Sequence, residues 1–233
     1  KSDDDPENNF LQSNNVTPSS AFQNAVDKIF QLYSEITGIT FVKVTETSTQ
    51  CGDIRIGLND MVDDGLYGVT HGPFYYLGSG GLDIWINNTV LGDSNWSDGS
   101  DGFHTLLHEI GHTLGLDHPH DDSDGSTLNS AGDAVYYTVM SYKDYVGDGM
   151  LQFSITTTAG TEAYPYTPMY LDIQALQYIY CWDDQIGEFV YPELNSGNDT
   201  YTFTEEYFYN LTIYDTGGTD TLDFSAYSFD LTI

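Results

Sequence analysis

Hydrophobic positions recur at helical spacing in three segments, residues 22–36, about 103–114 and 170–180. Residues three and four apart lie on one face of a helix, so each segment predicts an amphipathic helix with one buried side. Thr17-Pro18 offers an N-cap and a proline at the first helical position, and Gly38 supplies a stop for the first helix.

Strand-like runs of β-branched and aromatic residues fall between these helices, at 39–44, 53–58 and 81–87. From about residue 195 the pattern changes to short Thr- and Tyr-rich segments around a turn at 215–220. These patterns predict an α+β domain followed by a small β-rich annex.

The 233 residues suit one domain with a small annex.

The charge of the chain narrows the range of its binding partners. Its 36 acidic residues against 5 basic ones give a net charge of −31. Such a charge repels nucleic acid and anionic membranes, so neither is expected as a partner. No apolar run is long enough to cross a bilayer. Two explanations for the acidity stay open, namely calcium-binding loops and solubility in a salty medium.

The residues that carry chemistry lie together in one segment, as His108, Glu109, His112, Gly115 and His118. Positions i and i+4 share a helix face, so His108 and His112 can point at one metal ion, with Glu109 able to reach a water on it. Gly115 can end the helix in a left-handed conformation and bring in His118 as a third ligand. Three imidazoles leave a position open on zinc, which is typical of a catalytic site. A core helix that carries histidines by chance does not account for this spacing.

The pattern HExxHxxGxxH resembles the zinc motif of the metzincins, and Pro119 directly after it resembles the serralysin family. The segment TVMSY at 138–142 resembles the Met-turn of that family. The resemblance implies that Met140 is an apolar floor under the zinc. It also implies that Tyr142 is an extra zinc ligand that swings away when substrate binds.

The implied fold is α+β, a metzincin-like twisted and mixed, mostly parallel sheet with an active-site helix and a Met-turn, plus a short C-terminal β annex. The implied division is a zinc-protease catalytic domain at 1–190 and a β-rich segment at 191–233. Residues 213–227 in this segment resemble the start of a calcium-binding β-roll. The resemblance makes calcium a second cofactor, with contacts expected from Asp215, Gly217, Gly218 and Asp220.

The run GLDIWIN resembles the edge strand along which metzincins bind an extended peptide by strand addition. On this basis substrate binding is expected at Gly81, Leu82, Asp83, Ile84 and Trp85. An ordinary edge strand with no such role is the alternative.

Two cysteines, Cys51 and Cys181, suit either one disulfide or two buried thiols. The helix after the Met-turn in the resembled family usually ends in Tyr-Gly, and Cys181 replaces that glycine. This departure favours a bridge to Cys51. Among the other histidines, His104 is interpreted as polar surface or as a neighbour of the ligands, and His71 and His120 as solvent-facing.

The combined expectation is a secreted, monomeric, zinc-dependent endopeptidase that hydrolyses extracellular proteins or peptides with Glu109 as general base. A catalytically inactive, calcium-stabilised extracellular binding module is the alternative from another class. It accounts for the acidic loops but does not require Glu109 beside three histidines. A matrixin- or astacin-like peptidase is the rival among enzymes, and Pro119 and the Ser-Tyr pair after Met140 favour the serralysin side.

Overall fold

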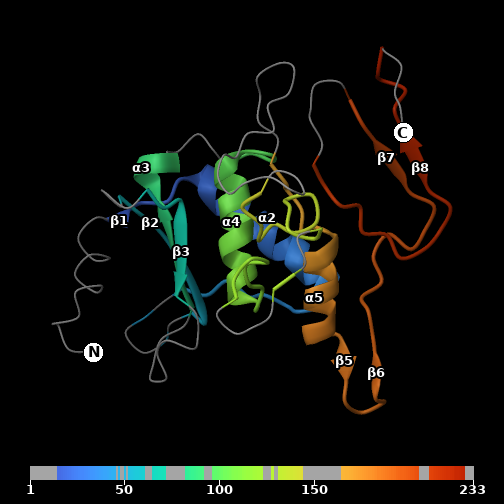
Figure 1. Ribbon diagram of the computed structural model, residues 1–233, viewed down its shortest axis with the longest axis horizontal. Helices are drawn as coiled ribbons and strands as arrows, with labels where there is room; N and C mark the ends of the chain where they lie inside the picture. The colour runs from blue at the N-terminus through green and yellow to red at the C-terminus, as the bar shows by residue number, and fades with distance from the viewer. Residues whose placement is uncertain are drawn as a thin grey trace.

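The fold is taken from a computed structural model of the 233-residue chain (Figure 1). The structure describes residues 15–45, 47, 50, 52–60, 65–71, 82–91, 96–122, 127–128, 131–143, 164–204 and 210–228.

A mixed sheet of four described strands forms one side of the domain, in the order β1-β2-β4-β3. The strands are β1 (Asn15–Val16), β2 (Ile54–Asn59), β3 (Gly68–His71) and β4 (Leu82–Asn87). β2 and β4 are parallel, whereas β1 pairs antiparallel with β2 and β3 pairs antiparallel with β4. The sheet is mixed as expected, but the expectation of a mostly parallel sheet is wrong for the described strands.

Two strand assignments from sequence need correction. Residues 39–44 form no strand. Their β-branched side chains have no partner strand to pack with among the described residues, and Val42 is 75% exposed. The run expected at the sheet edge is β4, which lies between β2 and β3. Its alternate residues Ile84 and Ile86 are fully buried, as suits an inner strand. Among the described strands, the edge beside β4 is therefore β3.

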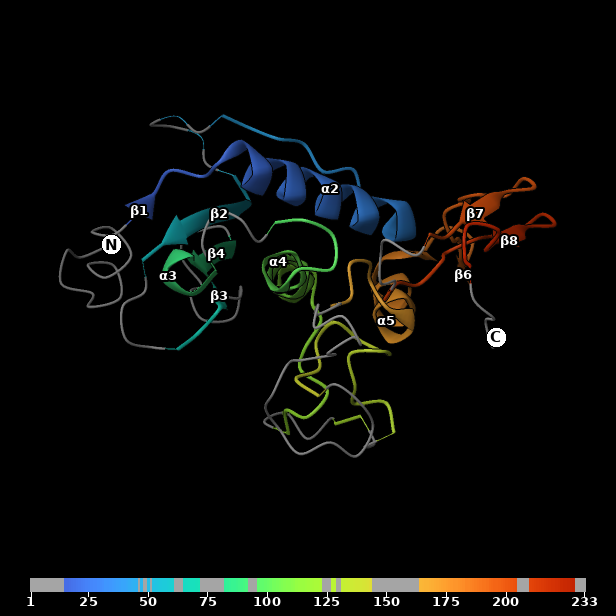
Figure 2. The same cartoon turned by 90° about the horizontal axis from the view of Figure 1, so that it is seen from above.

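Three long helices lie beside this sheet, and the last of them in the chain packs on the first, away from the strands (Figure 2). They are α2 (Ser20–Thr37), α4 (Asp101–Thr113) and α5 (Tyr170–Tyr180), and a short α3 (Asn88–Leu91) follows β4. Helix α2 begins later than expected, because Ser19 rather than Thr17 is its N-cap and accepts a hydrogen bond from Phe22 N. Gly38 ends it with a φ of +75°, in the left-handed region. No helix in the described part of the chain is long and apolar enough to cross a membrane.

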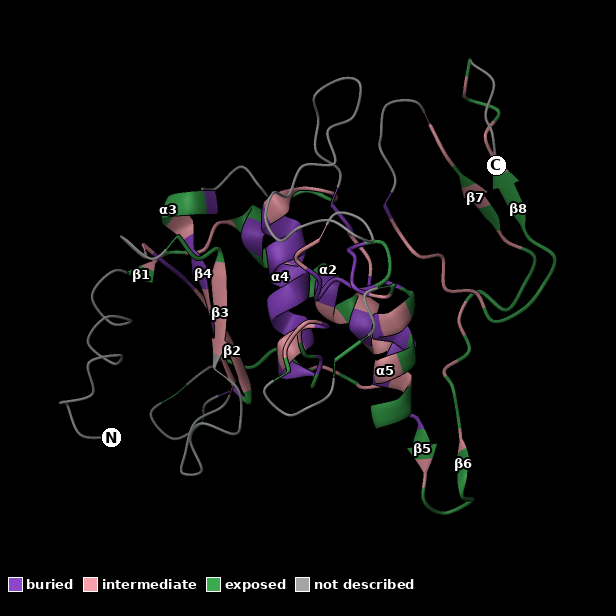
Figure 3. Cartoon of the chain, in the orientation of Figure 1, coloured by how far each residue is buried: buried purple, intermediate pink, exposed green. Residues whose placement is uncertain are grey.

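Helix α4 is the most buried element, and Figure 3 shows it buried along most of its length. Leu106, Leu107 and Ile110 are fully buried in the core that α4 shares with α2 and the sheet. The buried Tyr33 of α2 donates its hydroxyl hydrogen bond to Leu107 O at 2.7 Å. This core fixes the helix that carries the first two predicted zinc ligands.

The chain after α5 forms two small strand pairs at one end of the molecule (Figure 1). β5 (Trp182–Asp183) and β6 (Glu188–Phe189) are antiparallel, and β7 (Thr200–Thr202) and β8 (Thr221–Asp223) are parallel. Gln177 of α5 donates a hydrogen bond to the Tyr214 hydroxyl at 2.7 Å, which joins the annex to the helical part. The division at 190/191 stays a prediction.

The cysteine bridge also stays a prediction. Cys181 follows α5 and is buried, with no bridge to a cysteine in the described residues and its Sγ 3.8 Å from Thr37 O. Cys51 lies outside the described residues.

Each lysine and arginine in the described residues pairs with an aspartate. The pairs are Lys28–Asp98, Lys43–Asp27, Arg55–Asp83 and Lys143–Asp133. The first two are exposed and contribute little to stability, whereas the carboxylate of Asp133 is buried.

Candidate metal centre and active site

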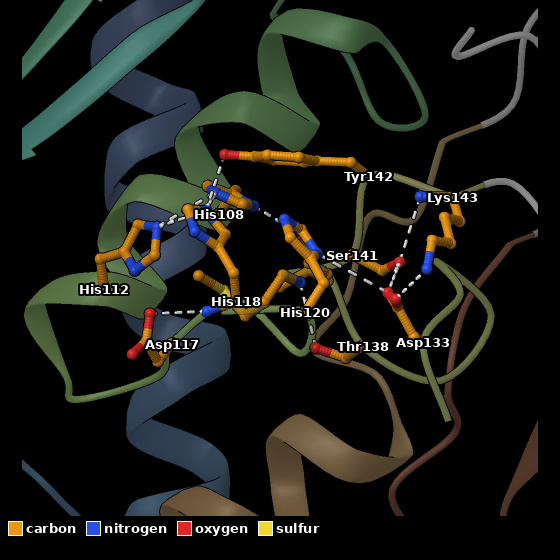
Figure 4. A network of polar contacts seen from close by, with 12 residues as sticks. His108, His112, Asp117, His118, His120, Asp133, Thr138, Ser141, Tyr142 and Lys143 are labelled. Atoms are coloured by element: carbon orange, nitrogen blue, oxygen red, sulfur yellow. Dashed lines mark hydrogen bonds and ion pairs between the residues drawn. The ribbon is translucent and has the colours of Figure 1, made fainter. Parts of the chain in front are cut away.

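Three imidazoles converge on one point beside α4 (Figure 4). His108 and His112 come from successive turns of α4, and His118 comes from the segment that follows the helix. Each pair of Nε2 atoms among the three is 3.1 Å apart. The structure thus brings together all three residues that the sequence predicts as zinc ligands.

Main-chain carbonyls orient the two helical imidazoles. His108 Nδ1 lies 2.8 Å from Val139 O, and His112 Nδ1 lies 2.9 Å from Leu116 O. A carbonyl only accepts, so both Nδ1 atoms carry the proton and both Nε2 atoms present lone pairs to the shared point. Burial lowers the pKa of His108 well below its usual value and also lowers that of His112, which favours neutral ligands.

Zinc fits this donor set. Tetrahedral zinc with Zn–N bonds of about 2.0–2.1 Å places ligand nitrogens about 3.3 Å apart, close to the 3.1 Å of the triad. Unprotonated nitrogens facing one another at this distance repel unless a cation lies between them. Three histidines would hold the ion and leave a coordination position for water or substrate.

A left-handed glycine brings the third histidine into place. Gly115 has a φ of +96°, a conformation that residues with a Cβ rarely adopt, and Leu116 N then donates back to Gly111 O at 3.1 Å. Burial lowers the pKa of His118 to about 4, and the nearby carboxylates of Asp117 and Asp121 oppose this shift. All three ligands are therefore neutral at neutral pH.

The side chain of Glu109 extends from α4 toward β3, the strand beside β4 at the edge of the described sheet. Its side chain is buried, and Thr70 donates a hydrogen bond to its Oε2 at 2.5 Å. Gly68 makes this close approach possible, because a Cβ there would lie 2.9 Å from Glu109 Cγ. Burial raises the pKa of Glu109 to about 7, although the Thr70 hydrogen bond lowers it. The carboxyl group is thus poised to exchange a proton near neutral pH.

Tyr142, the last residue of the predicted Met-turn, reaches the triad (Figure 4). Its hydroxyl oxygen lies 2.7 Å from His118 Nε2, and its ring stacks on that of His108 with centroids 5.7 Å apart. Burial, assisted by the charge of Glu109, raises the pKa of Tyr142 to about 12, which favours the protonated phenol. The position suits the predicted role as a switchable ligand, which stays a proposal.

The predicted floor residue Met140 is fully buried and packs against α4 where that helix carries Gly111. A Cβ on Gly111 would lie 3.1 Å from Met140 Sδ and 3.1 Å from the Tyr33 hydroxyl. Buried Asp172 of α5 fixes the turn from the other side. It accepts hydrogen bonds from the Thr138 hydroxyl at 2.6 Å and from Val139 N at 2.9 Å.

Of the remaining histidines, one interpretation is right in its second alternative and one is wrong. His104 is buried rather than on the polar surface, and it is a neighbour of the ligands, because its ring lies 6.5 Å from that of His108 between centroids and stacks on Tyr164 on another side. His120 faces the site rather than solvent, with its ring stacked on His118 at 5.3 Å. The side chain of His71 lies outside the described residues.

The predicted substrate-binding residues lie on an inner strand. Leu82, Asp83, Ile84 and Trp85 belong to β4, and Gly81 lies outside the described residues. The backbone of β4 pairs with β2 on one side and β3 on the other, so it cannot receive a peptide by strand addition. Among the described strands, a peptide bound by strand addition would pair with β3.

A carboxylate cluster in the annex contains two of the predicted calcium residues. Asp215 and Asp220 gather with Asp199, each offering an oxygen within 4.8 Å of the others. Asp199 Oδ2 is buried with no hydrogen-bond partner in the described residues, as suits an oxygen directed at a cation. Gly218 has a φ of +108°, and a Cβ there would lie 1.5 Å from Gly197 O. Three hard oxygen donors fit calcium.

Calcium is therefore expected to raise the melting temperature of the chain, by about 5–10 °C at a hundredfold excess over its dissociation constant. A thermal-shift titration at fixed ionic strength measures this. Asp199→Asn should abolish the response, whereas Asp53→Asn, at an exposed position, should keep it. A non-saturating response to sodium chloride, equal in both variants, would favour general screening instead.

Several residues of these sites were missed by sequence reasoning. Thr70, Asp133 and Asp172 carry no motif, and only tertiary contacts reveal them. Asp199 could have been found from the sequence, because the segment NDTYTF at 198–203 is repeated as TDTLDF at 219–224, where Asp220 was predicted. The structure pairs the two copies in register, Thr200 with Thr221.

Comparison with known proteins agrees with this site. Residues 7–125 match the family described as Matrixin (Peptidase_M10). The chain is 32% identical to serralysin C of Dickeya chrysanthemi over 243 residues, covering 94% of this chain and 48% of that protein. It is 31% identical to metallopeptidase AprA of Pseudomonas marginalis over 209 residues, covering 85% and 43%. A serralysin of Proteus mirabilis is 38% identical over 142 residues, covering 57% and 27%. The chain thus spans about half the length, or less, of these relatives.

Proposed function

The chain belongs to the matrixin family of peptidases as a serralysin-like metzincin, and on this premise we propose that it is a zinc-dependent endopeptidase. The observation that carries the proposal is the arrangement of three converging neutral imidazoles with a buried carboxyl group and a phenol beside them. Zinc held there lowers the pKa of a bound water to about 7 and polarises a carbonyl group.

Glu109 is the general base in this proposal. Its raised pKa of about 7 lets it accept a proton from the attacking water and return that proton to the leaving amine. Thr70 and Gly68 fix the carboxyl group from β3, so the base is oriented before substrate arrives. Tyr142, a phenol at neutral pH, donates a hydrogen bond to the oxyanion that develops on the substrate carbonyl.

The substrates we propose are protein or peptide chains outside the cell, bound by a secreted, monomeric enzyme. The names of the relatives support a peptidase, and the net charge of −31 disfavours nucleic acid and anionic membranes. The alternative, an inactive calcium-stabilised binding module, is favoured only by the annex cluster of Asp199, Asp215 and Asp220. It gives no reason for a buried Glu109 beside the triad.

The deciding experiment is incubation of the zinc-loaded chain with a library of unstructured peptides, followed by mass spectrometry. Internal cleavages that stop when zinc is chelated and return when zinc is added are the expected result. A zinc-loaded, folded chain that cleaves no peptide would favour the binding module.

Thr70 provides a pH-dependent prediction. Thr70→Val removes a hydrogen bond to the Glu109 carboxylate, so the pKa of Glu109 should rise and the acid limb of kcat/KM should move to higher pH. A charge-assisted hydrogen bond is worth roughly one pKa unit or more, so kcat/KM should fall about tenfold at the acid end and less at high pH. A pH–rate profile measures the shift. Thr70→Ser keeps the hydroxyl and should restore the profile, and an equal loss at every pH would contradict the assignment.

A further inference from the structure

One buried carboxylate holds both chain neighbours of Tyr142 (Figure 4). The Ser141 hydroxyl donates to Asp133 Oδ1 at 2.7 Å, and the Lys143 ammonium group pairs with Asp133 Oδ2. Asp133 is 3% exposed and Ser141 is fully buried. The two residues flanking the phenol are therefore fastened to one acceptor from the turn that precedes the Met-turn.

Main-chain contacts close the same loop. Lys143 N donates to Ser141 Oγ at 3.1 Å, and Val135 N donates to Lys143 O at 2.8 Å. Any displacement of the main chain at Tyr142 would break contacts on both of its sides. The anchor is strong as well as close, because breaking one side of a buried ion pair leaves an uncompensated charge.

The charge on Asp133 supports this anchor. Burial alone would raise the pKa of Asp133, but the hydrogen bonds from Lys143 and Ser141 lower it below its usual value. The carboxylate is thus ionised at neutral pH, and it stays a strong acceptor for both neighbours.

The side chain of Tyr142 points away from this anchor toward the metal centre. Its hydroxyl lies 2.7 Å from His118 Nε2, and its ring centroid is 4.9 Å from that of His120. His120 extends the network on the far side, with Nδ1 3.9 Å from Asp133 Oδ1. The functional end of the tyrosine is thus at the site, whereas its main chain is fixed.

We propose that Asp133 is a positioning residue for Tyr142, which holds the main chain at 141–143 so that the phenol moves only by side-chain rotation. The effect of Asp133 on turnover rests on the proposed peptidase function. Its effect on the position of the phenol at a bound metal does not. A residue that merely stabilised the loop would lower stability without acting through Tyr142.

A double-mutant cycle separates these two roles. Asp133→Asn keeps an acceptor for Ser141 and removes the charge that holds Lys143. It should lower kcat roughly 10- to 100-fold, because a small misplacement of a catalytic group can have an effect of this size, with a much smaller change in KM. In the Tyr142→Phe background the same substitution should lower kcat less than about twofold. Equal fold losses in both backgrounds would overturn the proposal.

The matched control is Asp98→Asn, which breaks the exposed pair with Lys28. This variant should leave kcat unchanged in both backgrounds. If Asp133→Asn does not fold, Ser141→Ala removes only one of the two links. It should lower kcat in the same way but less, and again not in the Tyr142→Phe background.

A spectroscopic test needs no peptidase activity. Copper(II) loaded in place of zinc should give a visible phenolate-to-copper charge-transfer band, absent from Tyr142→Phe. Asp133→Asn should weaken or shift this band, whereas Asp98→Asn should not. A band unchanged in Asp133→Asn, or absent from the unsubstituted chain, would overturn the proposal. A chain that shows the expected bands yet cleaves no peptide would refute the peptidase function and leave the positioning role standing.

Discussion

Glu109→Gln is expected to lower the turnover number by about 10²- to 10⁴-fold while the chain keeps its zinc. Glutamine has the shape of glutamate, and its amide oxygen can still accept the hydrogen bond from Thr70, so the fit against β3 is preserved. The amide cannot take a proton from water near neutral pH. Steady-state kinetics on protein of measured zinc content provide the test.

Glu188→Gln on exposed β6 is the matched control and should turn over at the normal rate. Near-normal turnover of a zinc-replete Glu109→Gln variant would show that another group moves the proton. Loss of zinc from that variant would instead show that Glu109 helps to hold the metal.

Removal of zinc is expected to abolish peptide cleavage and to lower the melting temperature by roughly 8–16 °C. The second figure assumes free zinc at a thousandfold excess over its dissociation constant, which stabilises the folded state by about 4 kcal/mol. The structural reason is that the facing Nε2 atoms of His108, His112 and His118 lose the cation between them. Differential scanning calorimetry and a peptide assay measure the two effects.

This experiment needs excess calcium throughout, so that the annex keeps its own ion. A non-chelating isomer of phenanthroline is the control for the chelating one, and added zinc should restore both properties. A metal-free chain that still cleaves peptides would contradict the metal-dependent mechanism.

The helices and the zinc-binding segment could be predicted because their signals are local. The apolar spacing of α2 and α4 is set by the helical repeat, and the separation of His108 from His112 follows from the same repeat. Gly115 could be assigned a left-handed turn because few other residues adopt one. Each inference needed only residues within a few turns of one another.

Strand order and the anchors of the site could not be predicted, because they depend on distant approaches. An apolar run such as β4 is equally compatible with an inner and an edge position, and its neighbours decide between them. Thr70 matters only because β3 comes to lie against α4, 39 residues away along the chain. Asp133 likewise has a role only after its turn has folded back onto Ser141 and Lys143.

The contacts around Gly111 bear on how this chain can vary through evolution. Zinc chemistry places no demand on that position, since its neighbours His108 and His112 are the residues directed at the metal. The constraint on it comes instead from Met140 and Tyr33, whose side chains lie 3.1 Å from where a Cβ would be. A side chain at this position would require those partners to shift by a few tenths of an ångström. A position of the zinc motif that does not bind the metal is thus coupled by packing to two distant parts of the sequence.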